Sequence, residues 1–260
     1  MKPGAVVETI SLYPLQGIPL IRSGDDLSTI IIESVHSNKF QWSDSDILVI
    51  AQKIVSKSEG RLVNLKQIQP SKHSIELASR TEKDPRLVEL ILSESKKVIR
   101  FKKGLIVVQN HQGVILANAG IDHSNVEQDD ENDQVLLLPK NPDVSAEKIH
   151  KNLFARTGFH LGVIINDSIG RAWRNGTIGT AIGVAGLPAI LDLKGRDDLF
   201  GNPLQVSEQA IADELASAAS LIQGQADEAI PVVLIKGFKT LLDNIPASSL
   251  IRDIKNDLFL

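Results

Sequence analysis

The order of apolar and polar residues along the chain predicts a mixture of strands and helices. Short runs of valine, isoleucine and leucine bounded by turn residues indicate buried strands, and apolar residues spaced three and four apart indicate amphipathic helices. The predicted strands are 6–12, 46–51, 104–108, 114–117, 163–165, 180–185 and 231–236. One helix is predicted from Asp25 to about residue 37, two more begin at Ser71 and Asp84, and three cover 145–157, 207–222 and 248–257.

The two kinds of element do not alternate regularly. This favours an α+β fold, with mixed or antiparallel sheets and flanking helices, over a doubly wound parallel sheet. The 260 residues suffice for one large domain or two intimately associated ones, and the chain shows neither an internal repeat nor a low-complexity linker. We therefore expect residues 1–260 to form a single domain.

The segment from Leu161 to Gly186 stands out because an apolar run is followed at once by chemistry-bearing side chains. The predicted strand 163–165 leads into Asn166, Asp167 and Ser168. A carboxylate and a hydroxyl at the exit of a buried strand are well placed to hold a hard cation. The alternative is a strand, a turn and a second strand with solvated charges, since aspartate often caps turns.

Composition and charge narrow the classes of function. The chain is 42% hydrophobic and 23% charged, as in an ordinary globular protein, and its net charge of −4 argues against general nucleic-acid binding but not against a nucleotide pocket. It has no cysteine, which excludes disulfides, thiolate nucleophiles and zinc–thiolate sites and fits a cytoplasmic location. It has neither a signal-peptide core nor an apolar stretch long enough to span a membrane.

A second carboxylate, Asp122, follows the predicted strand 114–117 and could neighbour Asp167 in one sheet. Such a pair suits magnesium or manganese, which leave room for phosphate oxygens. The acidic loop from Gln128 to Gln134 reads as a solvated segment instead, and no P-loop or dinucleotide fingerprint is present. Positive charge that could receive phosphate or carboxylate groups, or form a solvated basic face, comes from Lys53, Lys57, Arg61, Arg171 and Arg174.

Several blocks of the sequence, in the same order, resemble the coenzyme F420-0:L-glutamate ligase family. The resemblance covers roughly residues 8–238. It rests on GIPLI at 17–21, AQKIVSKSEGR at 51–61, NAGIDHSNVE at 118–127, NDSIGRAWRNGTIGTAIGVAG at 166–186, GRDDLFGNPL at 195–204 and ADELASAASLIQGQADEAIPVVLIKG at 212–237.

The resemblance implies a GTP-dependent amide ligase with a two-part α+β fold of interleaved subdomains. In such enzymes the γ-phosphate of GTP activates a carboxylate of F420-0, and the amine of L-glutamate then displaces the phosphate, also on F420-1 in later rounds. Cations must neutralise and align the anionic reactants, and no cysteine or serine nucleophile is needed. The resemblance also implies Mg²⁺ or Mn²⁺, allows K⁺ as a further ion, and implies an intertwined homodimer.

Carried over by position, the resemblance implies three groups of site residues. Metal ligands would be Asp122, Asp167, Ser168 and Gln225, and Asp122, Asp167 and Lys57 would have catalytic roles. Arg171 and Arg174 match arginines of the family, and we infer a catalytic role for them with phosphate or the acidic substrate. The nucleotide would contact Ile18, Pro19, Leu20, Ile21, Gln52, Lys53, Lys57, Asn125, Gln223, Gly224, Gln225, Ala226, Asp227, Glu228, Ala229 and Ile230.

Three departures from the family pattern leave substrate preference open. Ala172 stands where proline is frequent, Lys236 where arginine is usual, and Gln223 where methionine is frequent. Two alternatives therefore remain: a ligase of the same mechanism with another acid acceptor, or a non-catalytic protein that binds F420 or a nucleotide. Competition among acceptor acids would test the first, and metal-dependent GTP hydrolysis coupled to glutamate would exclude the second.

Overall fold

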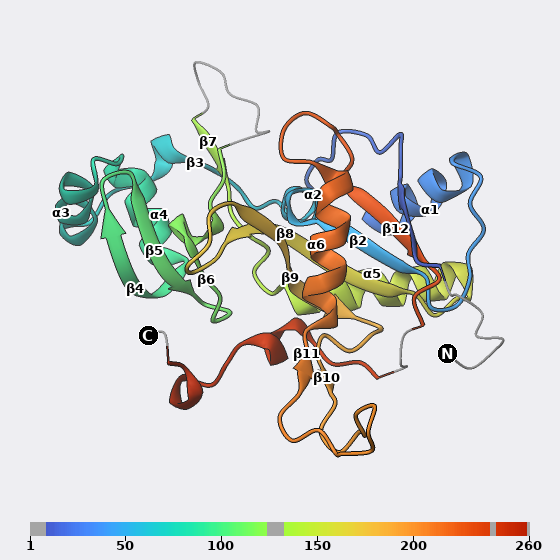
Figure 1. Cartoon of the computed structure of the whole chain (residues 1–260). Helices are drawn as coiled ribbons and strands as arrows, with labels where there is room; N and C mark the ends of the chain where they lie inside the picture. Colours follow the sequence, from blue (N-terminus) through green and yellow to red (C-terminus); the bar gives the residue numbers. More distant parts are fainter. Residues whose placement is uncertain (1–8, 124–132, 240–242, 259–260) are drawn as a thin grey trace.

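A five-stranded sheet forms the centre of the molecule (Figure 1). The computed structural model describes residues 9–123, 133–239 and 243–258. The strand order is β1-β12-β2-β8-β9; β2 and β8 are parallel and the other pairs are antiparallel. The strands are β1 (Ser11–Pro14), β2 (Ile47–Ala51), β8 (Gly162–Gly170), β9 (Thr177–Ala185) and β12 (Val232–Lys236).

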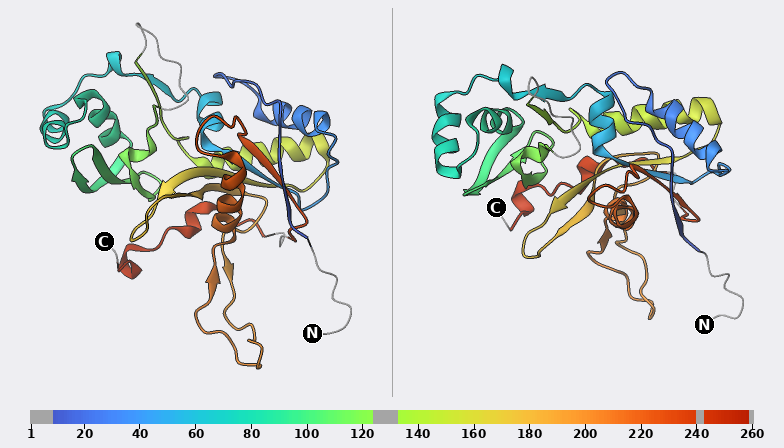
Figure 2. Two further views of the ribbon diagram at one scale, coloured as in Figure 1. Left: turned by 45° about the horizontal axis from the view of Figure 1, so that its top comes forward. Right: turned by 90° about the horizontal axis from the view of Figure 1, so that it is seen from above.

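Helices cover both faces of this sheet, as the two further views show (Figure 2). Side chains that alternate along β8 enter opposite cores: Val163 and Ile165 pack with α1 and α5, whereas Ile164 packs with α6. This arrangement explains the continuous apolar runs of β2 and β8, since a strand buried on both faces has no polar side. The helices are α1 (Leu27–Ser37), α5 (Pro142–Thr157) and α6 (Ile211–Gln223).

A smaller subdomain lies at one end of the sheet, on the left of Figure 1. Two helices pack on a three-stranded antiparallel sheet around a core that includes Leu77, Val88, Ile91 and Ile106. A two-stranded ladder, β3 with β7, connects it to the main body. These elements are β3 (Leu62–Asn64), α3 (Lys72–Thr81), α4 (Pro85–Ser93), β4 (Ser95–Lys102), β5 (Leu105–Asn110), β6 (Ile115–Ala117) and β7 (Gln134–Leu136), with 3₁₀ turns at Leu65–Gln67 and Asn118–Gly120.

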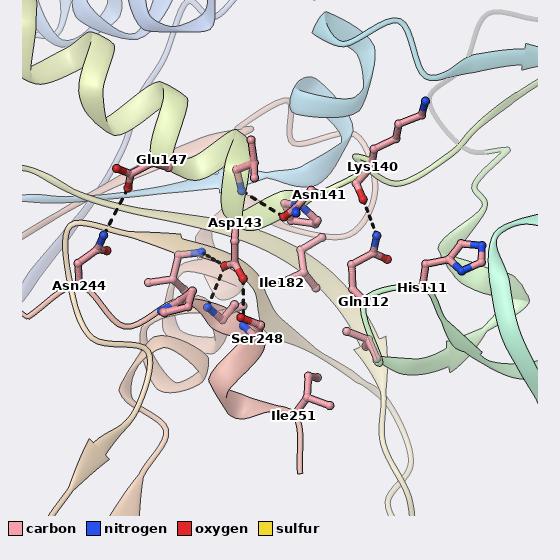
Figure 3. Close-up of a pocket in the computed structure, with 17 residues that line it drawn as sticks. His111, Gln112, Lys140, Asn141, Asp143, Glu147, Ile182, Asn244, Ser248 and Ile251 are labelled. Atoms are coloured by element: carbon pink, nitrogen blue, oxygen red, sulfur yellow. Dashed lines mark hydrogen bonds between the residues drawn. The ribbon is translucent and has the colours of Figure 1, made fainter. Parts of the chain in front are cut away.

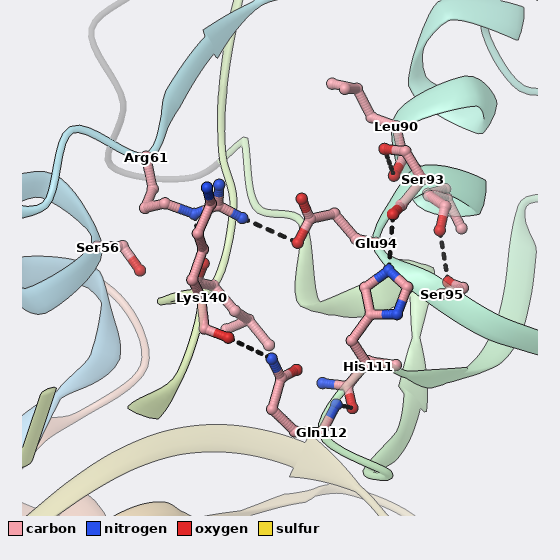
Figure 4. Close-up of polar contacts among 12 residues, drawn as sticks. Ser56, Arg61, Leu90, Ser93, Glu94, Ser95, His111, Gln112 and Lys140 are labelled. Carbon is pink, nitrogen blue, oxygen red and sulfur yellow. Dashed lines mark hydrogen bonds and ion pairs between the residues drawn. The ribbon is translucent and has the colours of Figure 1, made fainter. Parts of the chain in front are cut away.

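Polar contacts fasten this subdomain to the main body (Figure 4). Arg61 donates through Nε to the carbonyl of Leu138 and pairs with the Glu94 carboxylate at 2.8 Å. The Gln112 side chain donates to the carbonyl of Lys140. Because Arg61 is largely buried, its ion pair is better shielded from solvent than a surface pair. The two parts are therefore held by directed bonds as well as by the chain connections.

Most predicted elements are confirmed, and the fold class is α+β as expected. Several details differ. Of the strand predicted at 6–12, residues 6–8 lie outside the described residues, and the observed strand β1 covers Ser11–Pro14; the helix predicted at 207–222 covers Ile211–Gln223. The strand predicted at 163–165 continues to Gly170, and the polar segment after Ala51 forms the helix α2 (Gln52–Ser58). The side chain that caps α1 is Asp26, which accepts from the Ser28 and Thr29 amides, not Asp25. The region 248–257 forms only 3₁₀ turns, at Ala247–Leu250 and Ile254–Asn256.

Strand β9 pairs with another strand on one side only, and side chains occupy its free edge. The amide of Ala181 donates to Asp213, and the amide of Val184 donates to Asp143. The amide of Gly179 donates to the hydroxyl of Ser220 on α6. These three bonds satisfy backbone donors that would otherwise be unpaired.

A two-stranded hairpin, β10 (Leu191–Asp192) with β11 (Glu208–Gln209), projects from the body at the bottom of Figure 1. Its loop carries exposed Leu199 and Phe200. Within the described ranges, no helix combines the length and the apolar character needed to cross a bilayer.

Candidate active site

The predicted site residues gather at one edge of the central sheet. The carboxyl ends of the parallel strands β2 and β8 meet there, with Ala51 in register with Asn166. The end of β1 lies at this edge too, because the amide of Leu15 donates to the carbonyl of Val232 at the start of β12. The segment before β12 lies there as well, because the amide of Ala51 donates to the carbonyl of Pro231. Four segments distant in sequence are thus brought together where open sheets commonly bind ligands.

Two carboxylates and an ammonium form the charged centre of this edge. Lys53, the second residue of α2, pairs with Asp122 at 2.8 Å (Nζ to Oδ2), and both side chains are about 30% exposed. The pKa of Asp167 is raised to about 6, chiefly by burial and also by the negative charge of Asp122, while the hydrogen bond from the Ser168 amide and the charge of Lys53 act to lower it. From the sequence, Asp122 and Asp167 could have been neighbours in one sheet. Asp122 instead lies outside the central sheet and forms an isolated bridge with Leu136.

A hydroxyl and an amide lie beside the carboxylates. Gln225, in the turn after α6, donates through Nε2 to the Ser168 hydroxyl at 2.8 Å. The Ser168 amide in turn donates to Asp167 at 2.9 Å. The strand β8 therefore places Asp167 and Ser168 where both the Asp122 segment and the turn after α6 can reach them.

A chain of buried amides, which the sequence analysis missed, supports this arrangement. Asn166 is 4% exposed and donates through Nδ2 to the Gln223 side chain at 2.6 Å. Gln223 donates onward to the carbonyls of Val49 and Pro231. Asn166 Oδ1 is buried and accepts no hydrogen bond from the described residues. The signal in the sequence was an asparagine directly after a buried apolar run, a position where a polar side chain needs a partner.

We expect Gln223→Met to destabilise the protein, although methionine packs well in apolar surroundings. The substitution would leave the Asn166 amide buried without its acceptor, at a cost of about 1–3 kcal/mol. Chemical denaturation of the wild type, Gln223→Met, Asn166→Leu and the double variant would measure this coupling. The double variant should lose less stability than the sum of the two single variants, and strict additivity would contradict the pairing.

The two segments predicted to contact the nucleotide flank this centre. In the 18–21 loop, Leu20 is exposed while Ile18 and Ile21 pack into the core, so the loop is anchored at its two ends. In the 223–230 turn, the Ala226 amide donates to Glu228 at 2.8 Å. Gln52 is buried and accepts from the Ser56 hydroxyl at 2.9 Å. Its side chain therefore helps to build α2 and is not directed into open space.

The remaining predicted residues divide into three groups. Lys57 is half-buried and follows Lys53 by one helical turn, which places the two ammonium groups on one side of α2. Arg171 and Arg174 lie at the exposed tip of the β8–β9 hairpin, past the end of β2. Asn125 and most of the acidic loop lie outside the described residues.

A cavity elsewhere in the molecule is lined by none of the predicted site residues (Figure 3). It measures about 720 Å³ and lies between the β5–β6 turn, the start of α5, β9 and the C-terminal segment. Asp143 beside it accepts from the Ala247 and Ser248 amides and so fastens the C-terminal segment to α5. The carboxylate of Asp143 therefore has a structural role in holding the C-terminal segment.

The donor set at the sheet edge fits a divalent cation. The negative charge of Asp122 acts on Asp167, and two carboxylates placed this close together favour a cation between them. The Ser168 hydroxyl and the Gln225 amide add neutral oxygens, the ligands that magnesium and manganese accept. Clusters of three or more histidine, cysteine or acidic side chains are absent from the described part of the chain, so a metal would rely on these mixed donors.

Comparison with known proteins shows the family to which the chain belongs. The family described as F420-0:Gamma-glutamyl ligase matches residues 17–237. A protein of Methanothermobacter thermautotrophicus named coenzyme F420:L-glutamate ligase is 48% identical over 229 residues, 88% of this chain and 89% of its own length. Its namesake in Methanocaldococcus jannaschii is 43% identical over 255 residues, 97% and 96% of the two chains.

A third namesake, from Methanosarcina mazei, is 43% identical over 223 residues, 86% of this chain and 84% of its own length. The family match spans every described segment that builds the sheet edge, from the 18–21 loop to β12. The chain belongs to the F420-0:gamma-glutamyl ligase family and is a ligase.

Proposed function

We propose that this protein joins L-glutamate to F420-0, and to F420-1 in a later round, at the expense of GTP. The relatives named above support the reaction. The observation that carries the proposal is the paired arrangement of Asp122 and Asp167 around Lys53 at the edge where the nucleotide segments converge. A site for phosphoryl transfer needs such a mixture, because anionic reactants must be both neutralised and aligned.

In this proposal the chain's own residues hold the reactants. The 18–21 loop and the 223–230 turn cradle the nucleotide, while Lys53 and Lys57 face its phosphates from α2. Asp122, Asp167, Ser168 and Gln225 would hold Mg²⁺ or Mn²⁺, with K⁺ as a candidate further ion. The divalent ion would neutralise charge on the transferred phosphoryl group.

The bond changes need no side-chain nucleophile. A carboxylate oxygen of the acceptor attacks the γ-phosphorus, and the bond to GDP breaks. The amine of L-glutamate then attacks the activated carbonyl carbon, loses a proton and expels inorganic phosphate. The chain contributes by holding the three reactants close enough for both displacements, an effect that replaces costly encounters in solution.

Mass spectrometry of purified protein incubated with F420-0, L-glutamate, GTP and Mn²⁺ tests the proposal. We expect a product heavier by one or more glutamyl residues that is absent without GTP. Bound GTP with no product would point to another acceptor acid. If the protein forms no product and also binds no nucleotide, the proposal is refuted.

We further propose that the protein works as a homodimer in the cytoplasm. The absence of cysteine suits a reducing compartment. Exposed apolar side chains on the β10–β11 hairpin, Leu199 and Phe200, offer surface that a second copy could cover. Sedimentation velocity should then give the mass of two chains, and a monomer at micromolar concentration would contradict this assignment.

A further inference from the structure

The tip of the β8–β9 hairpin presents an unusual aromatic side chain. Trp173 is 86% exposed, and its backbone adopts a left-handed conformation with φ of +66°. A bulky residue rarely adopts this conformation, because its side chain crowds the backbone. An indole exposed at such a turn offers a large flat surface for a ligand.

Two cations flank the indole. Arg171 and Arg174 are exposed, and neither forms an ion pair with any part of the chain that the structure describes. Arg171 donates to the Gly176 carbonyl at 3.3 Å, which ties it across the turn. The tip therefore combines an aromatic face with two guanidinium groups, a surface suited to a planar anion.

Topology separates this tip from the nucleotide segments. The loop after β1, the start of α2 and the turn before β12 all lie on one side of β8 in the sheet order. The hairpin lies on the other side, because β2 ends opposite Asn166 while β8 and β9 remain paired to Gly170 and Thr177. Asp167 and Ser168 lie between the two regions.

We propose that the hairpin tip binds the acceptor, with the planar ring of F420-0 stacked on Trp173 and its phosphodiester facing Arg171 and Arg174. This inference rests on the proposed function. F420-0 is a flat deazaflavin joined through a sugar alcohol and a phosphodiester to a terminal carboxylate. Its flat ring suits the indole, and its phosphodiester suits the two guanidinium groups. GTP is also a planar anion, but its proposed segments lie across the sheet edge.

The spacing along the strand is compatible with this assignment. Each strand residue advances ~3.3 Å, so the tip lies on the order of 15 Å beyond the Asp167–Ser168 pair. An acceptor whose ring rests on Trp173 would direct its carboxylate back along the hairpin toward that pair. The nucleotide would approach the same pair from the β12 side, which brings the reacting groups together.

Steady-state kinetics of Trp173→Ala and Trp173→Phe test the proposal, with F420-0 or GTP varied in turn while the other two substrates are saturating. Trp173→Ala should raise KM for F420-0 by about tenfold, the loss expected for one stacking contact, and leave KM for GTP unchanged. Trp173→Phe should restore most of the affinity because it keeps a flat ring. Phe101→Ala, which removes a partly exposed ring from the smaller subdomain, should leave KM for F420-0 unchanged.

A binding measurement separates this inference from catalysis. Trp42 and Trp173 are the two tryptophans of the chain, so Trp42→Phe leaves Trp173 as the sole indole. F420-0 alone should quench its fluorescence, even if no ligation occurs. Unchanged fluorescence, or a rise in KM for GTP in place of F420-0, would overturn the proposal. Loss of a dimer on Trp173→Ala would show that a second copy covers the indole, and would overturn it equally.

Discussion

Asp167→Asn is expected to reduce ligation by about a hundredfold or more and, without metal, to make the protein more stable. The loss of activity follows because the variant removes one of the charges proposed to hold the divalent cation. Removal of a single electrostatic contact in an active site typically lowers the rate by about a hundredfold or more. The gain in stability follows because burial raises the pKa of Asp167, so the ionised carboxylate is disfavoured in the folded chain.

The pH dependence of this gain has a definite sign. Below about pH 3 the carboxyl is protonated in both folded and unfolded chains, and the stability difference should be small. As pH rises toward the folded pKa of about 6, the unfolded chain ionises first and the wild type loses stability relative to the variant. Above that pH the difference should level off at about 3 kcal/mol, which corresponds to roughly 5–10 °C in Tm.

Thermal unfolding across this pH range, with and without Mn²⁺, would check both effects. Manganese should stabilise the wild type more than the variant, because only binding to the folded state shifts Tm. Asp213→Asn is a matched control: burial also raises the pKa of Asp213, but its partner is the Ala181 amide. It should show the same sign with pH and retain ligation. Full activity and metal dependence in Asp167→Asn would refute the assigned role.

Gly183→Ala is expected to lower the free energy of unfolding by at least about 3 kcal/mol, near the upper range for overpacked cores. A Cβ at this position would lie 2.3 Å from the carbonyl oxygen of Pro142 and 2.5 Å from its carbonyl carbon. The obstacle is backbone at the start of α5, which cannot rotate away as a flexible side chain could. The clash would separate α5 from β9 or distort both.

Urea denaturation of Gly183→Ala beside Gly170→Ala would measure this effect. A methyl group added at Gly170, at the end of β8, would meet no atom within 4 Å, and this residue has no positive φ, so alanine there should be nearly neutral. The comparison separates the steric effect from the general preference of strands against glycine. Equal midpoints for the two variants would show that α5 and β9 are not packed as closely as described.

The sequence predicts elements well where local pattern and tertiary packing agree. Ser71 and Asp84 are recognisable as helix starts, and both side chains accept from backbone amides of the first turn. The predicted helix at 248–257 is wrong because a short helix needs tertiary packing to persist. Leu250 packs on the core but Ile251 and Ile254 are exposed, so the apolar contact ends after the first turn.

The site could be predicted as a set of residues but not as an arrangement. Asp167 and Ser168 are identified by their position after an apolar run, yet the strand continues past them because β9 pairs with it as far as Thr177. The approach of Asp122 depends on its bridge to Leu136, a contact between distant segments that no local pattern encodes. The Asn166–Gln223 pair could not be predicted for the same reason.

The occupied edge of β9 limits how copies of this chain can assemble. Asp143, Asp213 and Ser220 accept from β9 amides that an incoming strand would need, so a second chain would have to displace three existing bonds to extend the sheet. Joining two central sheets into one continuous sheet through β9 is therefore disfavoured. A dimer that keeps these three bonds would have to form through other surfaces of the molecule, and the β9 edge would then stay unchanged on assembly.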